Sequence, residues 1–262
     1  MKSFRIAILL ALPLAAQPVR YDAGTISGLR ARNIGSAMTS GRIAAVDAIE
    51  HEGRITVFAG SASGGVWKSV NGGTTFKPIF DLATSLSIGA VAIDPSQPEN
   101  VWVGTGESWV RNSVSVGDGI YKSTDGGENW TNTGLKDSEH IAKIVIDPRD
   151  GNTVWACATG HLWDDSDSGG VYKTSDGGKT WRKVLAGINR STGCAMLTTS
   201  RQERATLFAS LWDFRRAAWT FRSGGPGSGI FKSTDGGEHW SELGAANAKA
   251  CRRSRTAALP WQ

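Results

Sequence analysis

The chain has 262 residues, of which 40% are hydrophobic, 20% are charged and 33 are glycine. That composition is enough for a large hydrophobic core and excludes a disordered or collagen-like protein. The net charge of +5 comes from the segments 1–16 and 245–262, which hold six basic residues and no acids. The remainder carries 23 basic and 24 acidic residues, so the folded part lacks the basic surface that a nucleic-acid partner needs.

The N-terminus has the pattern of a signal peptide over residues 1–16. Lys2 and Arg5 precede an apolar run, Ile6–Leu14, and the two small alanines that follow suit cleavage. The run is too short to span a membrane, and no later segment is long enough. We therefore predict an exported chain, periplasmic or extracellular, with an N-terminal lead-in over 17–41.

Three cysteines make an odd count, with neither a Cys-x-x-Cys motif nor a histidine at metal-binding spacing. This pattern excludes a disulfide framework and a zinc site. A single bridge between Cys157 and Cys194 stays open as an alternative. The sequence also has no phosphate-binding loop and no Ser-His-Asp order, so we expect neither a metal nor a cofactor.

One motif occurs four times: Ser or Thr, any residue, Asp or Asn, two glycines, and an aromatic residue three positions later. Its Asp or Asn positions are 54, 51 and 59 residues apart. A second repeat, Ile-Asp-Pro followed by Val-Trp, precedes two of the copies. A period of about 50 residues indicates a solenoid, a propeller or an array. The repeated positions are Asn71, Asp125, Asp176 and Asp235.

Each repeat contains four short strand patterns and no helical periodicity. In the second unit the predicted strands are 88–93, 100–104, 119–123 and 130–133. Four antiparallel strands in about 50 residues are typical of a β-propeller blade, so we predict an all-β protein. The predicted propeller covers 42–244, with an unstructured tail over 245–262. Its four blades are predicted at Arg42–Asp81, Ile88–Thr133, Ile141–Val184 and Gly193–Leu243.

The repeated turn has a mechanical explanation. Its Asp or Asn side chain can accept hydrogen bonds from nearby backbone N–H groups, and its two glycines allow positive φ. The aromatic residue begins the next strand and can wedge between blades. We therefore assign structural rather than catalytic roles to Asn71, Asp125, Asp176 and Asp235.

These turns resemble Asp-boxes, also called bacterial neuraminidase repeats, which occur in sialidases, xyloglucan-cleaving glycosidases, photosystem-assembly propellers and sortilin-type receptor domains. From Arg32-Asn33-Ile34-Gly35 to the fourth turn, the chain is most similar to the N-terminal part of large exported bacterial sortilin-like proteins, described as repeat-containing glycosyl hydrolases. The resemblance covers about residues 20–243 and implies a propeller whose further blades lie beyond this chain. We expect a truncated N-terminal piece that forms an incomplete ring.

Alternating hairpins place the loops of a propeller on two faces. The repeated turns share one face with the loops that join first and second strands. The longer loops share the other face, and they are Ser61–Ser63, Gly106–Asp118, His161–Ser168 and Asp213–Gly227. Their aromatic and polar residues suit a sugar ring or a peptide side chain. The predicted ligand-binding residues are Trp109, Arg111, Asn112, His161, Trp163, Arg215, Arg216 and Trp219.

Catalysis has weaker support in the sequence. Glycoside hydrolysis uses two opposed carboxylates, and the acids on this face are Glu107, Asp118, Asp164, Asp165, Asp167 and Asp213. Of these, Glu107, Asp164 and Asp165 are the catalytic candidates. The two adjacent aspartates point apart, which makes them a poor pair. The resemblance to xyloglucan-cleaving enzymes implies a catalytic aspartate just before the Gly-Gly that opens the third strand of blade one, but Ser61-Ala62-Ser63 contains no acid. The sialidase-like sequence Phe-Arg-Ile occurs only inside the predicted signal peptide.

We therefore interpret the chain as an exported recognition module that binds a peptide or a glycan on its loop-rich face. Two alternatives stay open. One is a glycoside hydrolase of the sialidase or xyloglucanase type whose active site is incomplete in this chain. The other is a structural or assembly propeller. Whether the chain is an enzyme is undecided by the sequence, with the balance against catalysis.

Overall fold

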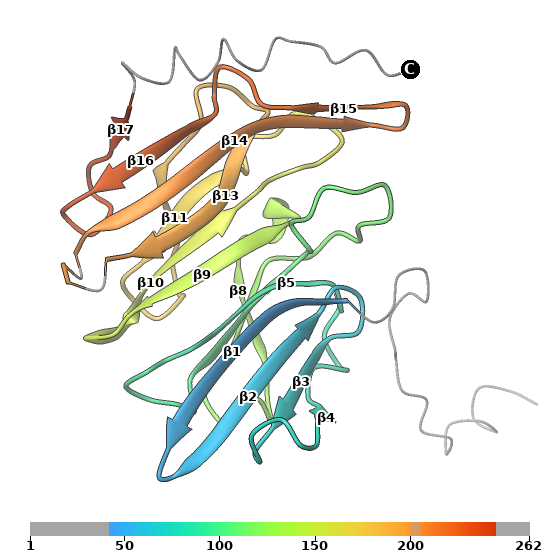
Figure 1. Cartoon of the computed structure of the whole chain (residues 1–262), viewed down its shortest axis with the longest axis vertical. Coiled ribbons are helices and arrows are strands. Elements are labelled where there is room, and N and C mark those ends of the chain that lie inside the picture. The colour runs from blue at the N-terminus through green and yellow to red at the C-terminus, as the bar shows by residue number, and fades with distance from the viewer. Residues whose placement is uncertain (1–41, 201, 204, 245–262) are drawn as a thin grey trace, which may run out of the picture. The chain divides into compact units, whose positions relative to one another are not determined.

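The computed structural model describes residues 42–200, 202–203 and 205–244. The predicted signal peptide, the lead-in and the C-terminal tail lie outside these described residues. The described part contains strands, one short 3-10 turn at Lys136–Ser138, and no α-helix. Its strands form four antiparallel sheets, one after another in chain order (Figure 1). The all-β prediction is confirmed.

Each sheet is a meander, in which four strands pair in chain order, and we number the sheets blade 1 to blade 4. Blade 1 consists of β1 (Ile43–His51), β2 (Arg54–Ser61), β3 (Val66–Ser69) and β4 (Lys77–Pro78). Blade 2 consists of β5 (Ile88–Ile93), β6 (Val101–Thr105), β7 (Ile120–Ser123) and β8 (Thr131–Gly134). Blade 3 consists of β9 (Ile141–Asp147), β10 (Asp150–Ala158), β11 (Gly170–Thr174) and β12 (Arg182–Leu185). Blade 4 consists of β13 (Thr192–Thr199), β14 (Leu207–Ala217), β16 (Gly229–Ser233) and β17 (Ser241–Leu243).

The hydrophobic core lies between blades, because successive residues of each strand face opposite sides of its sheet. In β6, Val101 and Val103 pack in the cluster shared with blade 1, and the intervening Trp102 packs in the cluster shared with blade 3. A third cluster joins blades 3 and 4 and includes Trp155 and Leu207. Both faces of blades 2 and 3 are therefore covered by neighbouring sheets.

Blade 4 departs from the predicted loop at Asp213–Gly227. Strand β14 continues to Ala217 and pairs with an extra strand, β15 (Thr220–Ser223), to form a projecting hairpin (Figure 1). Aromatic packing explains the extension, since the Trp212 ring lies 4.6 Å from the Phe214 ring and 5.7 Å from the Phe221 ring, centroid to centroid. The loop prediction was wrong for most of this segment, because its turn residues favoured a loop whereas the segment contains the end of β14 and all of β15.

The repeated turns are built around a buried hydroxyl as well as the predicted carboxylate. In blade 2, the Ser123 Oγ accepts a hydrogen bond from the Gly127 N–H at 2.8 Å and donates one to Asp125 at 2.7 Å. Asp125 in turn accepts from the Asn129 N–H at 2.9 Å. Gly126 and Gly127 have φ values of 68° and 96°, which favour glycine. The same buried hydroxyl stands at Ser69, Thr174 and Ser233.

The repeated turns lie at the same end of the blades as the loops between first and second strands. In blade 2, the Gly126 N–H donates to the Glu99 carbonyl at 2.8 Å, and in blade 3 the Gly177 N–H donates to the Asn152 carbonyl at 3.0 Å. These hydrogen bonds connect the two kinds of loop within one blade. The longer loops between second and third strands, such as 106–119, therefore occupy the opposite end.

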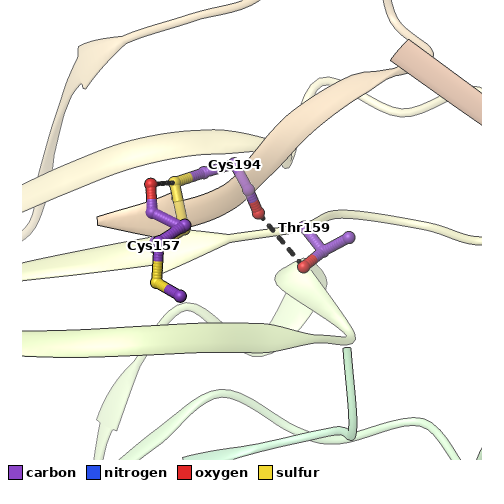
Figure 2. Close-up of a disulfide and its surroundings, with 4 residues drawn as sticks. Cys157, Thr159 and Cys194 are labelled. Carbon is purple, nitrogen blue, oxygen red and sulfur yellow. Dashed lines mark hydrogen bonds between the residues drawn. A yellow bond between two sulfur atoms is a disulfide. The ribbon is translucent and has the colours of Figure 1, made fainter. Parts of the chain in front are cut away.

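A disulfide joins Cys157 on β10 to Cys194 on β13 and so links blade 3 to blade 4 (Figure 2). Both cysteines are fully buried. Beside the bridge, the Thr159 hydroxyl donates a hydrogen bond to the Cys194 carbonyl at 3.2 Å. The structure thereby settles the alternative that the cysteine spacing left open.

Candidate functional site

Three long connections meet at the loop-rich end of blades 2, 3 and 4. They are the β6–β7 loop, the β10–β11 loop and the β14–β15 hairpin. The Arg216 Nε on the hairpin donates to the Asn112 side chain of the first loop at 2.6 Å. The Arg215 guanidinium donates to the His161 carbonyl at 3.0 Å and to Asp165 at 2.5 Å, both in the second loop. The structure therefore brings five of the predicted ligand-binding and catalytic candidates together.

Next to these connections lies a groove of about 550 Å³. Its floor is formed by the first strand of every blade, because residues of β1, β5, β9 and β13 all line it. Its wall is aromatic and comes from Trp109, Trp212 and Phe221. The side chains of Lys143 on β9 and Met196 on β13 also line the groove. An aromatic-walled groove of this kind can hold the faces of sugar rings or apolar peptide side chains.

The three loop tryptophans occupy different positions. Trp109 lines the groove and is 64% exposed, so its ring is accessible to a ligand. Trp163 and Trp219 are also exposed, at 44% and 86%, but neither is among the residues that line the groove. Trp219 lies in the turn between β14 and β15. Arg111 is exposed as well and stands outside the groove lining.

Sequence reasoning predicted only Trp109 among the lining residues and missed, among others, Lys143, Met196, Trp212 and Phe221. All four of these residues lie on strands in the structure. A usable signal existed at both aromatic residues, because Trp212 directly precedes the expected loop Asp213–Gly227 and Phe221 lies inside it. Lys143 and Met196 lie on the first strands of blades 3 and 4. No sequence signal marks them, because the exposure of those strands depends on how the blades are arranged.

The candidate catalytic acids are engaged by other side chains. Glu107 is buried and forms an ion pair with Arg42, whose Nε lies 2.7 Å from Oε1. Asp164 lies 2.7 Å from the His161 Nδ1, and Asp165 is paired with Arg215. Each of these acids is therefore paired with a basic side chain, and none of them is among the residues that line the groove.

His161 belongs to a small polar cluster beside the loops. Its Nε2 lies 3.0 Å from the Asp137 carbonyl and 3.7 Å from the Glu139 carboxylate. Burial raises the pKa of Glu139, and the nearby His161 opposes that shift. Glu139 also has a positive φ of 55°, which is uncommon for a residue other than glycine. Sequence reasoning gave no indication of Glu139, because the partners that position it come from a different loop.

Asp213 anchors the base of the β14–β15 hairpin. Its carboxylate accepts hydrogen bonds from Ser191 at 2.7 Å, from Arg222 at 2.7 Å and from Asn189 at 2.9 Å. Burial raises the pKa of Asp213, but the hydrogen bonds outweigh it and hold the pKa at about 2. Asp213 is therefore an ionised structural group that ties the hairpin to the segment entering blade 4.

Two other classes of site, a metal centre and a membrane-spanning helix, are absent from the described part of the chain. No cluster of three or more His, Cys, Asp or Glu side chains there has an arrangement that could hold a metal ion. No helix in the same part is long and apolar enough to cross a membrane.

Comparison with proteins of known sequence gives xyloglucanases as relatives. The enzyme of Paenibacillus sp. is 24% identical over 217 residues, which are 71% of this chain and 20% of the relative. The enzyme of Hypocrea jecorina is 25% identical over 212 residues, which are 72% of this chain and 24% of the relative. The chain thus spans about a quarter or less of the length of these curated relatives.

Solved structures give the same fold. The GH74 enzyme of Niastella koreensis matches with a TM-score of 0.53 and 24% identity, over 71% of this chain and 27% of that one. An ancestral GH74 enzyme matches with a TM-score of 0.56 and 21% identity, over 80% and 24% of the two chains. At such low identity the likeness shows the fold, and the predicted β-propeller architecture is confirmed.

A family model supplies the assignment. The Sortilin-Vps10 model, described as sortilin, neurotensin receptor 3, matches residues 64–207 and again 118–258. The first match alone covers more than half of the chain, and the second is offset by about one blade, as expected for repeats. Together with the four consecutive four-stranded sheets, these matches show that the chain belongs to the Sortilin-Vps10 family.

Proposed function

We propose that this chain is a recognition module that binds a polysaccharide strand in the groove beside its loop-rich face. The observation that carries the proposal is the aromatic wall of Trp109, Trp212 and Phe221 beside a floor made by the first strands of the four blades. Aromatic rings present flat apolar faces that suit the faces of pyranose rings. The names of the relatives, which are xyloglucanases, favour a glycan over a peptide and make a xyloglucan-type chain the first ligand to test.

Hydrolysis by this chain has less support than binding. The candidates Glu107, Asp164 and Asp165 are held by Arg42, His161 and Arg215 respectively. A retaining or inverting glycosidase needs two carboxyl groups that face each other across the sugar. The match covers only 20% and 24% of the two relatives that carry the enzymatic name, so catalysis stays a proposal about a longer protein.

We also propose that the repeated turns are Asp-boxes and that the protein is exported. Three hydroxyl–carboxylate networks and the equivalent hydroxyl–amide network at Asn71 support the first idea. The Cys157–Cys194 bridge supports the second, since disulfides persist in oxidising compartments outside the cytosol. N-terminal sequencing of protein secreted from a bacterial host should begin near Gln17. Recovery of an intact Met1 in a cytoplasmic pool would contradict export.

The binding proposal is tested by titration calorimetry with xyloglucan and cello-oligosaccharides, and with a peptide library as the alternative ligand class. Trp109→Ala should weaken glycan binding at least tenfold, which corresponds to about 1.4 kcal/mol, and leave the melting temperature unchanged. The same substitution at Trp219, which lies outside the groove lining, is a matched control with little expected effect.

Asp125→Ala provides the opposite comparison. Asp125 lies in a repeated turn at the other end of blade 2, so its loss should lower the melting temperature without changing binding. Abolished binding in an Asp125→Ala protein of unaltered melting temperature would show that the two faces are wrongly assigned. Binding of peptides but not of oligosaccharides would replace the glycan by a peptide ligand.

A further inference from the structure

The contacts between successive blades are built from the same types of residue at equivalent positions. The second strand of each blade contributes an aromatic residue whose register partner on the third strand is a lysine. In the first three blades the lysine ammonium lies 4.8–5.7 Å from the centre of the aromatic ring. The three aromatic residues are buried, at 0–1% exposure. These pairs are Phe58 with Lys68, Trp102 with Lys122, and Trp155 with Lys173.

Each lysine reaches the repeated turn of the following blade. Lys68 donates to the Gly126 carbonyl at 2.7 Å, and Lys122 donates to the Gly177 carbonyl at 3.3 Å. Lys173 reaches the same turn of blade 4 through Glu238, at 2.7 Å. Every contact between blades therefore combines apolar packing with a lysine that binds either a glycine carbonyl of the next turn or, in blade 4, the acidic side chain that follows its two glycines.

Blade 4 carries the same group of side chains without a following blade among the described residues. Its pair is Phe208 with Lys232, in the same register and 5.8 Å apart, but Phe208 is only half-buried. Beside them, Ile230 is 55% exposed, whereas its equivalents Val66, Ile120 and Val171 are all at 0%. We call Phe208, Ile230 and Lys232 the forward face of blade 4.

Blade 1 carries the complementary group, and no blade precedes it among the described residues. In blades 2 to 4, one residue on the first strand packs against the preceding blade, and its side chain is at most 3% exposed. The equivalent in blade 1, Val46, is 60% exposed and has Ala59 as its register partner. The other three residues at this position are Val91, Ile144 and Leu197.

The turn of blade 1 is uncovered in the same way. A Cβ on Gly178 would lie 2.8 Å from Trp102 of the preceding blade, and one on Gly127 would lie 3.5 Å from Phe58. A Cβ on Gly73 would meet only Phe76 of its own turn, which is 40% exposed. We call Val46, Gly73 and Phe76 the rear face of blade 1.

We propose that the forward face of blade 4 binds the rear face of blade 1 from a second copy of this chain. The argument for this occupant is complementarity, since the two faces are the halves of a contact that the chain itself forms three times. Lys232 would donate to the Gly72 carbonyl of the second copy, as Lys68 and Lys122 do within one chain. When the forward face of each copy binds the rear face of the other, neither face stays exposed. The pair then contains eight blades, which is within the range of closed propellers.

The test is the mass of the full chain in solution, measured by analytical ultracentrifugation at micromolar concentration. The wild type should have twice the mass of one chain. Ile230→Asp and Val46→Asp each place a carboxylate in one half of the contact and should each give a single-chain mass. Ile188→Asp is the matched control, because Ile188 is 76% exposed between blades 3 and 4 and outside both faces. It should retain the wild-type mass, and circular dichroism should show that every variant is folded.

Mixing the two single variants tests the direction of the contact. The Ile230→Asp chain keeps an intact rear face and the Val46→Asp chain keeps an intact forward face, so an equimolar mixture should recover pairs. A mixture that stays at single-chain mass would overturn head-to-tail binding. A wild type that stays a single chain would also overturn the proposal. So would a chain that forms pairs only after residues 245–262 have been removed. That last result would identify the chain's own C-terminal segment as the occupant of the forward face.

Discussion

Replacing Ser123 by alanine should destabilise the protein through one buried N–H group. The Ser123 Oγ is the acceptor for the Gly127 N–H at 2.8 Å, and both residues are buried. It also accepts a weaker bond from the Asp125 N–H at 3.3 Å. Without the hydroxyl, the Gly127 N–H is left unsatisfied, which costs about 1–3 kcal/mol. The apolar volume lost is negligible, so we expect about 2 kcal/mol in total.

The assay is equilibrium unfolding in urea under oxidising conditions, with calorimetry as a second measurement. A loss of about 2 kcal/mol corresponds to a melting temperature about 4–8 °C lower for a domain of this size. Blade 3 provides the matched control, because its Thr174 Oγ1 fills the same role at 3.0 Å from the Gly178 N–H. Ser123→Thr should therefore be close to wild type. The reasoning is refuted if Ser123→Ala unfolds at the wild-type urea concentration, or if Ser123→Thr is as unstable as Ser123→Ala.

Two further predictions concern pH and the disulfide. Burial lowers the pKa of His140 to about 4, below its unfolded value of about 6.5, so the folded state favours the neutral ring. Stability should be complete above about pH 6.5 and fall by about 3 kcal/mol as the pH drops to about 4, and His140→Gln should abolish this slope in urea unfolding measured across that range. The Cys157–Cys194 bridge spans 37 residues, which corresponds to about 4 kcal/mol of loop-closure entropy, so the double alanine variant should lose that amount and become insensitive to dithiothreitol. An equal response of variant and wild type to the reductant would contradict the pairing.

Much of the fold could be read from the sequence because its signals are local. The Gly-Gly turns require positive φ within a few residues, and short strands of alternating or fully apolar character lie between them. These features predicted β5 with the observed bounds, and β6, β7 and β8 to within one residue. The repeat period then gave four units and the blade architecture. The one segment read wrongly, β15 and the end of β14, lacks such a turn and depends on aromatic packing across the hairpin.

Only the tertiary structure decided the site. The spacing of the cysteines left their pairing open, and packing β13 against β10 brought Cys157 and Cys194 together. Trp109 meets Trp212 and Phe221 at one groove although about a hundred residues separate them in the chain. Glu107 was a catalytic candidate by loop position, but the fold buries it against Arg42. Turns and strands follow from neighbouring residues, whereas ion pairs, bridges and grooves depend on which distant strands the packed blades place side by side.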